Sequence, residues 1–263
     1  MMQPMKRKVL IIGIGPGNPD CVTIQAVNAL NQASVFFIPN KGTEKRELAQ
    51  LRREICERFI RERKYRMVDF DTPAREKPSS AYLKSVEAWR DKVEHVYERL
   101  LIEELGEDEC GAFLIWGDPS LYDGTLRILD KIHAKGNLKL EYEVIPGISS
   151  VQALAARHKV ALNRIGEPVM ITTGRRLAEG FPSNVDSVVV MLDGETAFKT
   201  VDGDIDIHWG AYIGTKDEIL VSGKLRDVVG EIERLRSAAR SDHGWIMDTY
   251  LLTRPANRPE GGE

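Results

Sequence analysis

Short runs of apolar residues alternate with longer polar stretches along this chain, and the pattern predicts an α/β protein. One apolar run begins at Val9 and enters a glycine loop at Gly13, and a second fills 111–116. Runs of this kind are typical of strands that are buried on both faces of a parallel sheet. Between the strands, apolar residues return with helical spacing. The clearest helices are predicted at 80–103, with a stripe that includes Trp89 and Leu100, and at 224–240.

The order of these elements predicts two domains. Up to about residue 156 the pattern is β-α repeated, which implies a mainly parallel sheet. Beyond a hinge near 163–168, strands are predicted at 168–172, 187–192, 208–213, 219–221 and 245–252, with a turn at 214–218, so the second sheet is expected to be mixed. The prediction is an N-terminal α/β domain over 1–165, a C-terminal α/β domain over 166–254 and a flexible tail over 255–263.

Composition narrows the class of protein. The chain has 263 residues and a formal net charge of −3, so nothing in the overall charge favours nucleic acid or an anionic membrane. No apolar run approaches the ~20 residues that span a bilayer. Three scattered cysteines fit the reducing cytoplasm, and five histidines without ligand spacing predict no metal. We therefore expect a cytoplasmic protein that binds neither nucleic acid nor membrane.

Three strand-to-helix loops are the candidate chemistry. They contain Gly13-Ile-Gly-Pro-Gly17, Trp116-Gly-Asp-Pro119 with Tyr122, and Pro146-Gly-Ile-Ser-Ser150. Ligands of open α/β sheets bind outside the carboxyl ends of the strands, and each loop occupies such a position. Plain turns and helix caps explain the same residues one at a time: Asp118 as a turn cap, and Ser149 and Ser150 as helix caps.

A basic stretch over 45–66 carries nine Lys or Arg against four Glu. A solvated helix face is the simpler interpretation. The alternative is that some of these arginines bind a polyanion, because guanidinium groups grip carboxylates as a fork.

Taken together and in this order, the three motifs resemble the tetrapyrrole (corrin/porphyrin) methyltransferase family. The segments 188–192 and 211–215 fall where that family has the cofactor contacts of its second domain. The likeness extends from about Val9 to Leu252. Within the family, 116–123 and 208–214 are most similar to the branch that methylates precorrin-5 at C1 and releases acetate, in the synthesis of cobalamin (vitamin B12).

The resemblance implies S-adenosyl-L-methionine as methyl donor, S-adenosyl-L-homocysteine as product, a cleft between two α/β domains, and a homodimer. The cofactor-binding positions carried over from it are Pro16, Trp116, Gly117, Asp118, Ser149, Ser150, Leu192 and Gly214. Methyl transfer from a sulfonium needs orientation and a dry site, and no metal. Release of acetate needs a proton relay. Tyr122 is the first candidate for that role and Tyr212 a weaker one, while Arg75, Arg175 and Arg176 are candidates for binding substrate carboxylates.

The same motifs are compatible with other functions. One is methylation of another corrin or porphyrin position, and another is methylation of RNA or a protein by the same fold. A third is a non-catalytic module that senses S-adenosylmethionine, since a fold does not fix a function.

Overall fold

The computed structural model describes residues 5–40, 46–62, 64–73 and 82–255, and by its internal contacts the chain divides into two units, Met1–Ser149 and Ser150–Glu263. The elements of the first unit are β1 (Met5–Gly13), η1 (Pro19–Cys21), α1 (Ile24–Leu30), β2 (Val35–Asn40), α2 (Arg46–Phe59), β3 (Arg66–Asp71), α3 (Tyr82–Glu103), β4 (Cys110–Ile115), α4 (Thr125–Ala134) and β5 (Leu138–Ile145). Those of the second are α5 (Ser150–His158), β6 (Val169–Thr173), α6 (Gly174–Leu177), β7 (Ser187–Met191), η3 (Ala197–Thr200), β8 (Asp206–Ala211), β9 (Ile219–Lys224), α7 (Leu225–His243) and β10 (Asp248–Thr253).

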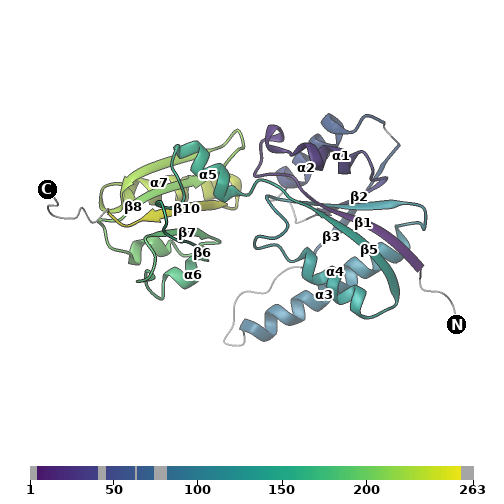
Figure 1. The fold of residues 1–263 in the computed structure, drawn as a ribbon. Coiled ribbons are helices and arrows are strands. Elements are labelled where there is room, and N and C mark those ends of the chain that lie inside the picture. The colour runs from purple at the N-terminus through teal and green to yellow at the C-terminus, as the bar shows by residue number, and fades with distance from the viewer. Residues whose placement is uncertain (1–4, 41–45, 63, 74–81, 256–263) are drawn as a thin grey trace. The chain divides into compact units, whose positions relative to one another are not determined.

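The first unit is a doubly covered parallel sheet with strand order β3-β2-β4-β1-β5. Alternate residues of β1 enter different cores. Val9 and Ile11 pack with α3 and α4, whereas Leu10 and Ile12 pack with α1 and α2. Figure 1 shows the two helix pairs on opposite faces of this sheet. Each fully buried Leu or Ile contributes about 1.5–3 kcal/mol, which explains why β1 is apolar from Val9 to Ile12.

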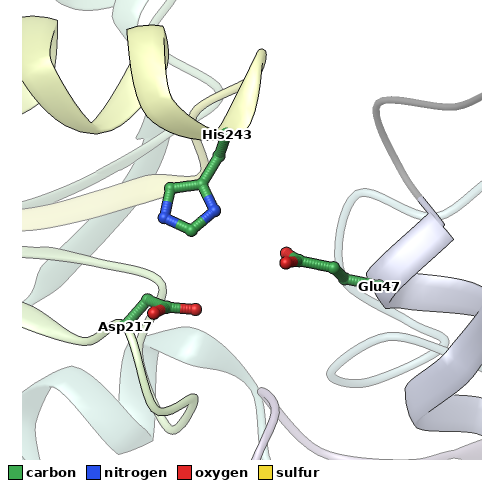
Figure 2. A group of neighbouring side chains, drawn as sticks. All are labelled: Glu47, Asp217 and His243. Carbon is green, nitrogen blue, oxygen red and sulfur yellow. The ribbon is translucent and has the colours of Figure 1, made fainter.

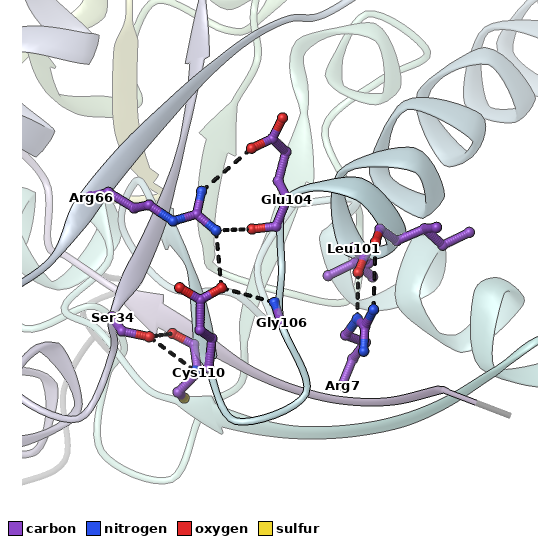
Figure 3. A network of polar contacts seen from close by, with 9 residues as sticks. Arg7, Ser34, Arg66, Leu101, Glu104, Gly106 and Cys110 are labelled. Carbon is purple, nitrogen blue, oxygen red and sulfur yellow. Dashed lines mark hydrogen bonds and ion pairs between the residues drawn. The ribbon is translucent and has the colours of Figure 1, made fainter. Parts of the chain in front are cut away.

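Polar contacts fasten α3 to the amino edge of this sheet, opposite the candidate loops (Figure 3). Arg66 on β3 pairs with the Glu109 carboxylate at 3.0 Å and donates to the carbonyl of Glu104. The Arg66 hydrogen bond holds the pKa of the Glu109 carboxyl below its usual value. The buried Arg7 donates to the Leu101 carbonyl at 2.7 Å. These bonds satisfy carbonyls at the end of α3 that have no partner within the helix.

The second unit is a mixed sheet with order β6-β7-β10-β8-β9. Within this sheet only β6 and β7 are parallel, and β8 and β9 form a hairpin around the turn predicted at 214–218. Trp209 and Tyr250 are fully buried in a core shared with α7. Gly210, which follows Trp209 in β8, faces the opposite side of the sheet. A Cβ at Gly210 would lie 2.9 Å from Cδ1 of Leu154 on α5. The two sheets confirm the predicted fold class.

Two boundaries differ from those expected from the sequence. The strand predicted at 168–172 is β6, and it leads directly into the short helix α6, whose four residues are too few for a periodic pattern. Helix α5 packs on β8 and β10 of the second unit, although it precedes the domain boundary expected at 165. We keep that boundary as a proposal, which limited proteolysis around 159–168 would test. The predicted tail falls, from residue 256 on, outside the described residues.

Candidate functional site

The three candidate loops of the first unit lie at neighbouring strand ends. Strand β1 is flanked by β4 and β5, so the loops that follow these strands leave the same edge of the sheet. Helix α1, which follows β1, packs on one face of the sheet, and α4, which follows β4, packs on the other. The adjacent strands β1 and β4 therefore form a topological switch point, the position where open α/β sheets bind their ligands.

Backbone hydrogen bonds join the first two loops directly. The Gly117 amide donates to the Gly15 carbonyl at 2.8 Å, and the Gly15 amide donates to the Gly117 carbonyl at 3.3 Å. Both residues have positive φ, +82° at Gly15 and +71° at Gly117. A side chain would be strained in this conformation. The two glycines thus allow the loops to continue pairing beyond the end of the sheet.

The third loop is in close contact with the other two. A Cβ at Gly147 would lie 2.2 Å from the Gly117 carbonyl oxygen, and one at Gly13 would lie 2.5 Å from the Gly147 amide nitrogen. From the sequence, the glycines at 13, 15 and 17 are expected to allow a ligand to approach the backbone. The structure shows that at 13 and 147 the approaching group is the backbone of a neighbouring loop. At Gly117 the space is more open, since the nearest heavy atom to a Cβ would be Cα of Ser149, 3.6 Å away.

Asp118 ties the turn after β4 to the loop after β5. Its Oδ2 accepts from the Gly147 amide at 2.9 Å, and its Oδ1 accepts from the Ser120 amide at 2.8 Å and from the Ser120 hydroxyl. Partial burial raises the pKa of this carboxyl, but the three hydrogen bonds outweigh burial, so its pKa lies below the usual value. Asp118 is therefore an ionised turn cap that also links two loops. A contact with the cofactor would use its remaining lone pairs.

The other predicted residues of the first unit surround this junction. Pro16 is buried, Trp116 is half-buried, and Ser149 is 4% exposed directly before α5. Tyr122, in the same loop as Trp116, has φ of +55° and is 45% exposed. Partial burial raises the pKa of its phenol, so the hydroxyl is protonated at neutral pH and can donate. A tyrosine with a left-handed backbone is unusual, and such residues are found most often at functional sites.

The second unit presents Leu192 in a comparable conformation. It follows β7 directly, has φ of +54° and is 66% exposed, an uncommon state for a large apolar residue. The next residue, Asp193, is buried. Its Oδ2 accepts from the Tyr250 hydroxyl at 2.6 Å, and its carbonyl accepts from Arg236 at 2.5 Å. Leu192 is therefore held outward by a rigid neighbour, and its side chain can contact a ligand.

Gly214 and Ser150 are constrained within the second unit. Gly214 has φ of +80° in the turn between β8 and β9, and its amide donates to Glu218 Oε2 at 2.8 Å. The Ser150 hydroxyl lies 3.2 Å from the Thr249 hydroxyl on β10.

Comparison with known proteins decides the family. The sequence model of the Tetrapyrrole (Corrin/Porphyrin) Methylases matches residues 8–229. The chain belongs to this family. It is 51% identical over 261 residues to a precorrin-6A synthase [deacetylating] from Sinorhizobium sp., a match that covers 99% of this chain and 100% of that relative. The family prediction is confirmed, and so is the prediction of a methyltransferase.

Solved structures agree with this assignment. A cobalamin synthesis related protein (CobF) from Corynebacterium diphtheriae is 35% identical, with a TM-score of 0.80 that covers 95% of this chain and 99% of that one. A uroporphyrin-III C-methyltransferase from Thermus thermophilus, solved as a complex with S-adenosylhomocysteine, is 16% identical with a TM-score of 0.55 and covers 94% and 97% of the two chains. The second likeness shows the fold alone.

Two residues that were candidates for proton relay or for binding substrate carboxylates in this tetrapyrrole methylase interact with other parts of the protein. The Tyr212 hydroxyl donates to the Trp245 carbonyl at 2.6 Å, and the side chain is 2% exposed, which favours a packing role over proton relay. Arg176 lies on α6 and forms an ion pair with Glu179 at 2.8 Å. Arg175 is on the same short helix, and Arg75 lies outside the described residues.

Sequence reasoning missed the buried polar residues of this methylase. Arg236 donates to Asp248 at 2.9 Å, and the two side chains are 8% and 3% exposed. Trp209 donates to the same Asp248 oxygen at 3.0 Å. A signal was present, because Arg236 continues the apolar stripe of α7 four residues after Ile232. A charged residue on a core stripe predicts a buried partner.

A trio of potential metal ligands is drawn in Figure 2. Asp217 and His243 belong to the second unit, and Glu47 belongs to α2 of the first. Two ligands from one unit do not make a metal centre, so we assign none here, and the absence of a metal stays a prediction. Among the described helices, none has the length and apolar character needed to cross a membrane.

Proposed function

We propose that this tetrapyrrole methylase methylates precorrin-5 at C1 and releases acetate, giving precorrin-6A in cobalamin synthesis. The observation that carries the proposal is the 51% identity over 261 residues with a precorrin-6A synthase. Relatives named for the C11 and C20 positions of other precorrins are only 22–27% identical. The identity with the precorrin-6A synthase is about twice as high and extends over the whole chain, which favours the ring position of that enzyme.

We propose S-adenosyl-L-methionine as the methyl donor, with S-adenosyl-L-homocysteine as product. This donor supplies an electrophilic methyl group on a sulfonium. The residues proposed to hold it are Pro16, Trp116, Gly117, Asp118, Ser149, Ser150, Leu192 and Gly214. The fit rests on the chemistry of these positions. The turn at Gly117 is open enough for a ligand to approach its backbone, Asp118 is ionised, and Leu192 offers an exposed apolar side chain.

Methyl transfer from this donor depends on orientation more than on chemical activation. A turn that is fixed by the Gly15–Gly117 hydrogen bonds and by Asp118 meets that requirement, because its backbone cannot reorganise during the reaction. Release of acetate requires water to attack an acetyl group, so a residue that passes protons must lie nearby. We assign this proton relay to Tyr122, whose raised pKa keeps the phenol protonated at neutral pH.

A mass-balance assay tests the proposal. The purified protein is mixed with S-adenosylmethionine and a mixture that contains precorrin-5, and the macrocycle mass and free acetate are followed together. The proposal requires one methyl gained for each acetate released. A methyl gained without acetate would move the enzyme to another ring position. Tight binding of S-adenosylmethionine without transfer would favour a sensor or a macromolecular substrate.

We also propose that the enzyme is a cytoplasmic homodimer that uses no nucleic acid or membrane partner. The support is the family resemblance together with the moderate net charge of −3 and the three scattered cysteines. Light scattering coupled to size-exclusion chromatography should give twice the chain mass of 29.6 kDa. A mass of one chain at micromolar concentration would contradict the dimer.

A further inference from the structure

The sheet of the first unit opens between β2 and β4, at the same edge as the candidate loops. Pairing of β2 with β4 runs from Val35↔Gly111 to Phe37↔Phe113 and then stops. On their other sides both strands go on. Strand β2 pairs with β3 as far as Asn40, and β4 pairs with β1 as far as Ile115. The gap therefore has a local cause.

That cause is Pro39. Successive residues of a strand turn their amide and carbonyl groups toward alternate edges. The carbonyls of Ser34 and Asn40 both accept from the β3 side, at 3.0 and 3.4 Å, so the even-numbered residues of β2 face β3 and the odd-numbered ones, Pro39 included, face β4. If the register continued, the residue at position 39 would donate its amide to the Leu114 carbonyl. Proline has no N–H to donate.

Arg52 supplies the missing donor from helix α2. Its Nε donates to the Leu114 carbonyl at 2.9 Å, and its Nη1 donates to the Leu48 carbonyl at 2.7 Å. The residue is 6% exposed, and within the described part of the chain its guanidinium forms no ion pair. Burial lowers the pKa of the Arg52 guanidinium to about 10, so it still carries its charge at neutral pH.

The Leu114 carbonyl lies two residues before the turn that begins at Trp116. On the β1 side, the next carbonyl, that of Ile115, accepts from the Ile14 amide at 2.9 Å. On the β2 side, Arg52 donates the bond that a continuing strand would have donated. A backbone amide would donate to the Leu114 carbonyl without burying a charge. Burial of the Arg52 charge, in contrast, costs several kcal/mol. With proline at position 39, the end of β4 is fixed by a side chain of α2 and not by the backbone of β2.

We propose that Pro39 and Arg52 act together as positioning residues for the turn Trp116–Asp118. Pro39 leaves the Leu114 carbonyl without a backbone donor on the β2 side, and Arg52 supplies the hydrogen bond that fixes the end of β4 before the turn. Their effect on the cofactor rests on the proposed function, because it assumes that this turn contacts S-adenosylmethionine. Their effect on the end of β4 does not depend on that assumption.

The test compares two variants in the full-length protein, Arg52→Met and Pro39→Ala/Arg52→Met. Methionine keeps the length of the apolar stem and removes the donors, and alanine at 39 restores a backbone N–H. We expect Arg52→Met to bind S-adenosylhomocysteine at least tenfold more weakly by isothermal titration calorimetry, with a raised KM for S-adenosylmethionine and a smaller change in kcat. The second substitution should recover at least threefold of the lost affinity. Arg53→Met is the matched control, since Arg53 is its neighbour on α2 and pairs with Asp69.

Hydrogen exchange separates this proposal from the proposed function. In Arg52→Met the Gly117 amide should exchange at least tenfold faster, and the double variant should restore much of its protection, whether or not the cofactor binds. If wild-type protein does not bind S-adenosylhomocysteine but this exchange pattern holds, the proposed function fails and the positioning role stands. Lack of rescue by Pro39→Ala in both measurements would overturn the positioning role. So would a lower Tm for Arg52→Met with unchanged affinity and exchange.

Discussion

Replacing Gly147 with alanine tests the contact between the three candidate loops. The added Cβ would lie 2.2 Å from the Gly117 carbonyl oxygen and 2.8 Å from the carbonyl carbon of Gly13. Both neighbours are backbone atoms, and the Gly117 carbonyl also accepts from the Gly15 amide, so neither can rotate away as a flexible side chain could. The loops would have to separate by about 1 Å to reach ordinary contact distance.

The cost follows from two opposing effects. Overpacking of a rigid site costs about 3 kcal/mol at the upper end of the usual range. Removing a glycine from the unfolded chain offsets about 0.4–1 kcal/mol of this cost. The net loss is about 2 kcal/mol or slightly more, which corresponds to a fall in Tm of about 4–8 °C for a chain of this size. Displacement of the Gly117 turn should also weaken S-adenosylhomocysteine binding at least tenfold, about 1.4 kcal/mol.

Differential scanning calorimetry and titration calorimetry measure these two effects. Gly230→Ala is the matched control, because Gly230 lies on the exposed face of α7 with nothing within 4 Å of its Cβ position. Alanine is the better helix former there and should raise the stability by about 0.5–1 kcal/mol. A Gly147→Ala protein with wild-type Tm and an affinity within twofold of wild type would refute the three-loop junction.

Three further changes test the charged groups. The lowered pKa of Asp118 means that its stabilisation is complete above the ordinary carboxyl pKa of ~4 and is lost as pH falls through the folded value. Asp118→Asn should therefore flatten the stability curve of the first unit below about pH 4 in acid titrations followed by circular dichroism. Burial, followed by the nearby His158, lowers the pKa of His208 on β8, although Asp206 opposes this. The neutral form is favoured in the folded state, so the second unit should lose stability as pH falls through ~6.5, and His208→Phe should remove that loss in urea titrations. Arg236→Met leaves the buried Asp248 carboxylate unpaired and should cost about 3–5 kcal/mol in urea denaturation followed by tryptophan fluorescence, and a cost under about 1 kcal/mol would contradict the buried pair.

Local patterns were sufficient to predict the elements that carry the site. The run from Val9 and the run 111–116 are apolar because both faces of their strands are covered, and that property is visible without a structure. Thr23 caps α1 by accepting from the Ala26 amide at 3.0 Å, as a threonine directly before a helix commonly does. Loops that follow parallel strands were expected at one edge of the sheet, where they are found.

What could not be predicted depends on strand register and on partners distant in sequence. Pro39 looks like an ordinary strand end until the register of β2 against β4 is known, and Arg52 is one of nine basic residues in its stretch. The interpretation of that stretch as a solvated face therefore fails for Arg52, which is buried. Tyr212 follows an apolar strand as a site residue would, but its hydroxyl donates to the Trp245 carbonyl, which is more than thirty residues away in the sequence. Spacing along the chain contains no information on such contacts.

The central claim is methylation at C1 coupled to release of acetate, and isotope labelling tests it most directly. The protein is supplied with S-adenosylmethionine that carries a ¹³C methyl group, the tetrapyrrole product is examined by NMR, and free acetate is quantified in the same tube. The account predicts one labelled methyl carbon, bonded to C1, and one unlabelled acetate per turnover. A label at any other ring carbon, or a methylated product without acetate, would contradict it.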